Sequence, residues 1–226
     1  MLRLMLAVVA PAVFLGFVAL YLHVSLLTLG VVLGKSFFRL AIAYAVSLVL
    51  GVAIAVLVGN TKNAGESWIA VFDVAQNIPS FALIPLFVLL MGYSSTMVIV
   101  FAATSIIWPI IFSTLNGIRG AHPSLNEAAT LFGASGWKRI RYYLLPLSYP
   151  AIITGSIVGV AMGWESVIGA EIIGSLSGIG LFLTNASTVG NKTLLFAGLA
   201  ALLLLVFTIN RLIWSPLLKH TYEYSD

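Results

Sequence analysis

The chain has 226 residues, of which 61% are hydrophobic and 8% are charged, and its mean hydropathy is +1.10. A soluble domain carries about 25% charged residues, so this composition excludes a water-soluble globular enzyme. The net charge is +4, and the basic residues lie between apolar runs, which favours a role in orienting the chain in a bilayer over nucleic-acid binding. The chain has no cysteine, which excludes disulfides, thiolate metal sites and cysteine nucleophiles.

Six apolar runs approach or exceed the length of about 20 residues that a helix needs to cross the hydrocarbon core. The sequence therefore predicts an all-α, polytopic membrane bundle in a single transmembrane domain, residues 1–226. The six predicted spans are Met5–Leu29, Phe37–Val58, Trp68–Met91, Met97–Asn116, Leu147–Gly169 and Leu194–Trp214. The first is expected to be retained, because Leu4–Leu33 is longer than the apolar core of a signal peptide.

Gly34-Lys35 marks the predicted break between the first two spans. Small residues then recur at every fourth position of the second span and again in the fifth. They are Ala43, Ser47, Gly51, Ala55 and Gly59 in the second, and Gly155, Gly159 and Gly163 in the fifth. This spacing lets helix backbones approach closely. Packing within the chain is favoured, and a subunit interface is the alternative.

The third predicted span contains two prolines, Pro79 and Pro85, and the polar residues Gln76, Asn77 and Ser80. Proline removes a backbone donor and kinks a helix, and Ser80 is placed to satisfy a freed carbonyl. Two interpretations stay open here. The span is either a broken helix that lines a pathway or an ordinary proline kink.

The segment Gly117–Pro146 is too polar to span a membrane and too regular to be a passive linker. Ser124 and Glu127 have the spacing of a capping box, and Gly133 is placed to end the helix in a left-handed turn. A second helical piece with Trp137 and basic neighbours is expected at the membrane surface, and Pro146 is expected to open the fifth span.

Glu127-Ala128-Ala129, Gly133 and Leu145-Pro146 resemble the EAA loop of ABC importer permeases, although Tyr143 stands where that family usually has isoleucine. The resemblance implies that a coupling loop, about 117–146, sits in a groove of a separate ATPase subunit. Carried onto this chain, the coupling residues are Glu127, Ala128, Ala129 and Gly133. The alternative is a capped connector without a partner.

The resemblance covers about 180 residues, from the second span to the end, and points to the nitrate/sulfonate/taurine branch. It rests on Asn77–Leu86 with Gly92, and on Trp164, Ala170-Glu171 and Gly178-Ile179-Gly180. It implies a small anionic solute such as nitrate, a sulfonate or taurine. A betaine-type osmolyte is the alternative solute. Ser80, Trp164 and Glu171 are the predicted pathway or gate residues.

Ionisable residues inside spans are costly and are therefore functional candidates. The sequence offers Arg39, Asp73, Glu165 and Glu171. Arg39 is expected to be a snorkelling anchor near the outer face rather than an anion site. The two glutamates are expected to be gate or packing residues. A secondary transporter or channel that uses these carboxylates is the alternative function, and a non-transporting scaffold is a second alternative.

No catalytic constellation is present in the sequence. Gly30–Ser36 has one residue too few between its glycines for a phosphate-binding loop, and the histidines His23, His122 and His220 lack metal-ligand spacing. The chain is therefore expected to be a transport subunit rather than an enzyme, with no cofactor or metal of its own. The family resemblance places ATP and Mg²⁺ on the separate ATPase.

Basic residues predict the orientation in a cell membrane, because they favour the cytoplasmic side. With a cytoplasmic N-terminus, eight lie inside and three outside, and both termini are cytoplasmic. The eight are Arg3, Lys62, Arg119, Lys138, Arg139, Arg141, Arg211 and Lys219, and the three are Lys35, Arg39 and Lys192. The resemblance further implies a dimer of identical or different permease subunits, two ATPase subunits and an external substrate-binding protein.

Overall fold

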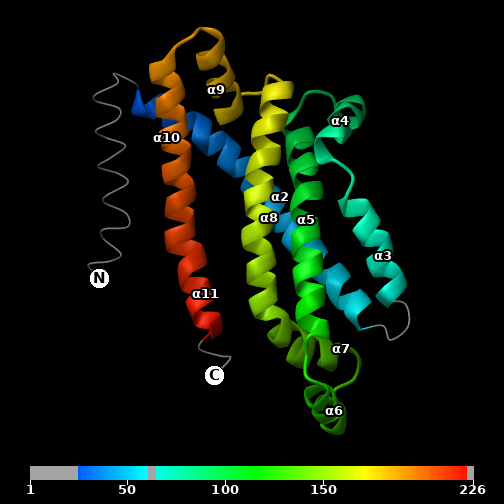
Figure 1. Ribbon diagram of the computed structural model, residues 1–226. Helices are drawn as coiled ribbons and strands as arrows, with labels where there is room; N and C mark the ends of the chain where they lie inside the picture. Colours follow the sequence, from blue (N-terminus) through cyan, green and yellow to red (C-terminus); the bar gives the residue numbers. More distant parts are fainter. Residues whose placement is uncertain (1–24, 61–64, 223–226) are drawn as a thin grey trace, which may run out of the picture.

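The computed structural model describes residues 25–60 and 65–222, which form helices and no strands (Figure 1). Four helical stretches are long and apolar enough to cross a membrane: 26–59, 95–119, 136–173 and 192–221. A bent pair of shorter helices makes a fifth if it counts as one span. The predicted all-α membrane bundle is confirmed, whereas the predicted number of six spans is not reached among the described residues.

Helix α2 (Leu26–Gly59) runs for 34 residues, and Ser25 caps its start by accepting a hydrogen bond from the Thr28 amide at 3.4 Å. Its length is about 51 Å at 1.5 Å per residue, more than the hydrocarbon core requires. The predicted break at Gly34-Lys35 is wrong. A helical glycine costs only about 1 kcal/mol, and no proline interrupts the backbone bonds there. The predicted first span lies outside the described residues except for its last five.

The third predicted span is broken. Helix α3 (Gly65–Gln76) is followed by a 3-10 turn, η1 (Ser80–Leu83), and by α4 (Ile84–Met91), and the two halves are inclined by 78°. Pro79 precedes η1, and Pro85 lies in the first turn of α4, where a missing amide hydrogen leaves no bond unmade. The angle favours a broken helix over an ordinary kink. The side chain of Asp73 lies outside the described set.

Two long helices contain a π-helical turn. Helix α7 (Gly136–Arg139) continues through η2 (Ile140–Leu144) into α8 (Leu145–Ile173). Likewise α10 (Lys192–Ile209) continues through η3 (Asn210–Trp214) into α11 (Ser215–Tyr222). Each turn ends two residues before a proline, Pro146 or Pro216. The proline ring clashes with the carbonyl four residues earlier in a regular helix, and the wider π turn relieves this. Pro146 lies in the first turn of α8, as predicted, and α7 and η2 lead into that helix without a break.

Helices α2, α5 (Ser95–Arg119) and α8 pack through their small residues. A methyl group on Gly155 would lie 2.7 Å from the Pro109 carbonyl oxygen, and one on Gly51 would lie 3.0 Å from a methyl of Ile110. Both neighbours belong to α5. The small residues thus serve close packing within the chain, as the sequence analysis favours.

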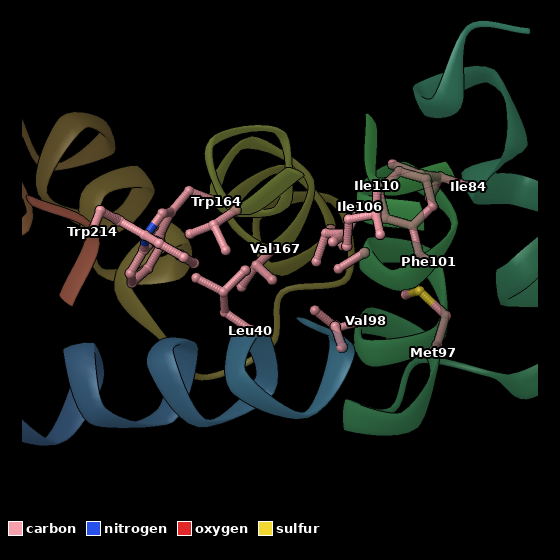
Figure 2. Close-up of a cluster of buried hydrophobic side chains, with 14 of the residues drawn as sticks. Leu40, Ile84, Met97, Val98, Phe101, Ile106, Ile110, Trp164, Val167 and Trp214 are labelled. Carbon is pink, nitrogen blue, oxygen red and sulfur yellow. The ribbon is translucent and has the colours of Figure 1, made fainter. Parts of the chain in front are cut away.

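The apolar core lies where these three helices meet, as Figure 2 shows. Phe101, Ile106 and Ile110 of α5 are fully buried, and Trp164 of α8 faces Trp214 of η3. Ile84 brings α4 onto the same cluster. This core separates two ends of the bundle. Helix α6 (Pro123–Leu131) lies at one end, and α9 (Ile179–Thr188) lies at the other (Figure 1).

Candidate functional site

Helix α6 connects α5 to α7 and is capped differently from the predicted capping box. The N-cap is His122, whose Nδ1 accepts from the Ser124 amide at 3.4 Å and contacts the Ser124 hydroxyl at 2.8 Å. Pro123 is the first residue of the helix, so the N-cap lies two residues ahead of Ser124. Ser124 is therefore not the cap, and Glu127 lies one turn inside the helix.

The end of α6 follows the prediction. Gly133 has φ +73°, a left-handed conformation that favours glycine. The Ala134 amide bonds the Ala129 carbonyl at 2.9 Å, and the Gly133 amide bonds the Thr130 carbonyl at 3.0 Å. These two bonds form a Schellman motif, which satisfies carbonyls that a helix end otherwise leaves open. The turn after α6 is thereby set by backbone geometry.

One side-chain bridge joins α6 to α7. Nη2 of Arg139 donates to Oδ1 of Asn126 at 2.9 Å, and the guanidinium lies over the ring of Tyr143 at 5.7 Å. Stacking on an aromatic face and donation to an amide oxygen both hold the arginine in place. Because α7 is continuous with α8, this bridge links α6 mechanically to a membrane-spanning helix. Sequence reasoning missed the bridge, since nothing local pairs residues 126 and 139.

The predicted coupling residues lie on α6 and in the turn that follows it. Glu127 is exposed and lines a groove of about 710 Å³ shared with Gly59 and Asn60 at the end of α2. Ala129 and Gly133 line a second groove of about 390 Å³ on another side of the helix, with Phe132 and Tyr142. Ala128 lies half-buried between the exposed positions. The four residues therefore lie on one short helix and its end.

Large apolar side chains at the tip of α6 have little cover within the chain. Leu131 and Phe132 are 88% and 91% exposed, and Trp137 and Tyr142 are also mostly exposed. A cluster of exposed apolar side chains rimmed by polar ones marks an interaction surface. This end of the chain thus presents a group of exposed apolar side chains.

The α9 end is built around a buried ion pair. Arg39 of α2 and Glu171 of α8 meet at 2.6 Å, and their side chains are 7% and 0% exposed. The Ser36 hydroxyl lies 2.8 and 2.9 Å from the two carboxylate oxygens, and the Gly180 amide donates to Oε2 at 3.0 Å. Arg39 is therefore not the snorkelling anchor that its position predicts. Glu171 has the hydrogen-bond partners expected of a packing residue.

Arg39 also ties two further segments to this pair. Its Nη2 donates to the Ser95 hydroxyl at the start of α5 at 2.9 Å, and its Nη1 donates to the Ser177 carbonyl before α9 at 2.8 Å. The Gly178-Ile179-Gly180 run lies directly against the carboxylate. A methyl group on Gly178 would overlap Glu171, which explains why glycine is needed there. We call these contacts the Arg39–Glu171 network.

The other predicted pathway residues lie elsewhere. Trp164 is 7% exposed and packs in the core, where it lines a small cavity of about 100 Å³ with Trp214 and Asn210. Ser80 is half-buried at the start of η1, beside the break of the third span. The structure does not bring Ser80, Trp164 and Glu171 into one cluster. Glu165, by contrast, is exposed on α8.

Within the described residues, no group of three or more histidine, aspartate or glutamate side chains is arranged to hold a metal ion. The two ends of the bundle thus offer an exposed protein contact and a buried ion pair. Neither arrangement aligns a nucleophile with a base. Their chemistry is that of docking and of holding helices together.

Comparison with known proteins agrees with this geometry. Residues 67–213 match the model of a family described as "binding-protein-dependent transport system inner membrane component". The matched region includes α6, the broken third span and the helices α5 and α8 that pack around the core. It also covers well over half of the chain.

Three curated relatives are transport permeases. The chain is 28% identical to the putative aliphatic sulfonates transport permease of Bacillus subtilis over 73% of its length, and 24% identical to the taurine transport system permease of Escherichia coli over 78%. It is 26% identical to a nitrate import permease of Leptolyngbya laminosa over 74%. These matches cover 59%, 64% and 61% of the relatives, so the chain spans about three fifths of their length.

The family match, the membrane-spanning helices and the exposed α6 between two of them agree with one another. The alternatives of a secondary transporter and of a scaffold are set aside by the family. This chain belongs to the family of binding-protein-dependent transport system inner membrane components, and its relatives described above are permeases for aliphatic sulfonates, taurine and nitrate.

Proposed function

We propose that the chain forms the translocation path of an ATP-driven importer and that α6 docks on a separate ATPase subunit. The observation that carries the proposal is the tip of α6, where Leu131 and Phe132 are 88% and 91% exposed beside Gly133. Large apolar side chains that are exposed beside one another mark a site of interaction with another protein or with the membrane. Glu127, Ala128, Ala129 and Gly133 are the coupling residues in this proposal.

The importer contains two permease subunits, with the path between them, and two ATPase subunits that hold ATP and Mg²⁺. A substrate-binding protein delivers the solute at the α9 end. The α6 end faces the cytoplasm in this arrangement, because Arg119, Lys138, Arg139 and Arg141 lie there. Both termini then lie on the cytoplasmic side of the inner membrane.

The coupling follows from continuity of the chain. Closure of the ATPase subunits displaces α6, and the Asn126–Arg139 bridge carries that displacement to α7. Helix α7 continues through η2 into α8 without a loop between them. A short helix can therefore act as a lever on a membrane-spanning one and bias inward-open against outward-open arrangements.

The solute we propose is small and anionic or zwitterionic. The relatives' names give aliphatic sulfonates, taurine and nitrate for those proteins, and this chain is similar to all three. A betaine-type osmolyte is the second candidate. The binding protein supplies much of the selectivity in such an assembly, and the permease needs only weak contacts along the path.

The test is co-purification in detergent with the ATPase that is encoded beside this chain. Wild type is compared with Glu127→Arg, which reverses a charge on α6, and with Gly133→Pro, which is incompatible with φ +73°. Ser187→Arg is the matched control, since Ser187 is an exposed polar residue on α9. All four proteins are first checked for membrane insertion.

We expect wild type and Ser187→Arg to retain the ATPase, and both α6 variants to lose most of it while they still insert. ATP hydrolysis by the complex should fall in parallel. Retention of the ATPase by both α6 variants at the wild-type level, with wild-type hydrolysis, would show that α6 is only a capped connector.

A further inference from the structure

Helix α8 has two faces of opposite character. Its small residues, among them Gly159 and Gly163, pack against α5 and α2. The opposite face is exposed and carries Thr154, Val158 and Glu165. Their spacing, with Ala161 between them, is that of one stripe along a helix. Figure 1 shows α8 between α5 and α10 with α2 crossing behind. The stripe is exposed, and Ala161 also lines the small cavity that Trp164 and Trp214 share.

The stripe differs from the exposed face of α10. Beyond its first two residues, Lys192 and Thr193, the exposed residues of α10 are all apolar: Phe196, Leu199, Leu203, Val206 and Phe207. An entirely apolar face suits contact with lipid tails. The α8 stripe instead contains a carboxylate and a hydroxyl. Ionisable side chains inside a span face the bundle interior or a water-filled cavity, since facing hydrocarbon is costly.

Glu165 lies well inside the span. It precedes the last residue of α8, Ile173, by eight positions, or about 12 Å along the helix. Its chain neighbours Trp164 and Ser166 are buried, so only the Glu165 side chain turns outward at this level. A glutamate side chain is therefore too short to reach the aqueous surface beyond the end of the helix.

Glu165 and Glu171 differ in their partners. The carboxylate of Glu171 forms an ion pair with Arg39, which is the one ion pair within residues 25–60 and 65–222. No side-chain hydrogen bond or salt bridge to Glu165 is present in the same part of the chain. A net negative charge therefore stands on the α8 stripe, and it needs water or a cation beside it.

We propose that the α8 stripe of Thr154, Val158, Ala161 and Glu165 lines the water-filled translocation path, where Glu165 favours solutes that carry a positively charged group. The inference rests on the proposed translocation role and narrows its solute class. A zwitterion with an ammonium group is favoured over a simple anion, because a fixed carboxylate in a low-dielectric passage attracts cations and repels anions.

The chain contains no cysteine, which makes it a ready background for thiol labelling. Thr154→Cys, Val158→Cys and Ala161→Cys are introduced singly into the full complex with its ATPase in membrane vesicles. Leu203→Cys on the apolar face of α10 is the matched control. Two membrane-impermeant methanethiosulfonates are applied, one carrying trimethylammonium and the other sulfonate, with and without ATP and vanadate.

If the stripe is lined by water, we expect each of the three α8 cysteines to be labelled at least about tenfold faster than the cysteine of Leu203→Cys. This difference should appear in one of the two states, with or without ATP and vanadate. Labelling no faster than the control in both states overturns the proposal. That result places the stripe against lipid or against the partner permease.

The second arm tests the charge. In the Ala161→Cys protein the thiol lies one helical turn from Glu165. The rate ratio of the cationic to the anionic reagent should fall about tenfold or more on Glu165→Gln, and it should stay unchanged on Lys192→Gln, which neutralises an exposed lysine at the start of α10. An unchanged ratio with Glu165→Gln overturns the assignment of Glu165 as a selectivity residue.

This outcome is separable from that of the coupling test. Loss of the ATPase from the α6 variants concerns docking, whereas labelling is measured in assembled complexes whose ATPase content is verified first. The α8 inference can therefore fail while the coupling proposal stands, and the reverse also holds.

Discussion

At the α9 end, a fully buried carboxylate is held by an arginine, a serine and a backbone amide, and the arginine reaches two further segments. At the α6 end, one arginine–asparagine bond supports a helix whose tip residues are up to 91% exposed. The α9 end satisfies its polar groups internally. The α6 end leaves apolar side chains exposed, and the proposed contact with the ATPase would cover them.

The two ends differ because one contains a buried ion pair and the other an exposed surface. A buried charge is tolerated only when every lone pair and proton has a partner, so the Arg39–Glu171 network is dense. A docking surface needs shape rather than internal bonding, and the Schellman turn at Gly133 supplies shape through the backbone alone. Substitutions should therefore cost stability at the α9 end and partner binding at the α6 end.

The largest effect is expected from Arg39→Ala. It leaves the Glu171 carboxylate buried without a counter-charge, which should lower the free energy of unfolding by about 3–5 kcal/mol. Thermal unfolding in detergent measures this. Lys35→Ala is the control, because Lys35 is exposed and a surface pairing contributes about 0–1 kcal/mol. The double variant Arg39→Met/Glu171→Leu should be more stable than either single change, and equal stability of Arg39→Ala and Lys35→Ala would contradict the network.

Gly178→Ala should have the next largest effect. Its methyl group would overlap the Glu171 carboxylate and force the turn before α9 to move, at a cost of about 1–3 kcal/mol. Gly30→Ala is a matched control, because a methyl group there meets nothing within 4 Å and alanine favours the helix. Thermal unfolding of both proteins decides the point. A wild-type melting temperature for Gly178→Ala would show that the turn has room to adjust.

Arg139→Ala should act mainly on partner binding. Losing the bond to Asn126 should lower stability by only about 1 kcal/mol, since the arginine is partly exposed, but it frees α6 from α7. We expect several-fold weaker retention of the ATPase in co-purification. Arg141→Ala, which removes an exposed arginine stacked on Tyr142, should retain the ATPase as wild type does. Equal retention by the two variants would remove the bridge from the coupling path.

The smallest effect is expected at the start of α6. His122→Ala removes the observed N-cap and should destabilise the helix by about 0.5 kcal/mol, whereas Ser124→Ala should change less. Hydrogen exchange of the α6 amides reports both changes. Faster exchange in Ser124→Ala than in His122→Ala would show that Ser124 caps the helix, as the sequence predicts.

The sequence by itself determined the membrane class, most of the span positions and the location of the docking helix. These features are local. Apolar runs of sufficient length, a left-handed glycine and a Glu-Ala-Ala run leave their mark within a few residues, as at Gly133. The close packing of the second and fifth spans could also be predicted, because helical periodicity places their small residues on one face, where another helix can approach.

The tertiary structure alone decided which charged residues are paired. Arg39 and Glu171 are 132 positions apart, and no local pattern distinguishes the neutralised Glu171 from the exposed Glu165 six residues earlier on the same helix. A pairing of this kind depends on a contact between distant segments, so it becomes visible only when the helices are packed.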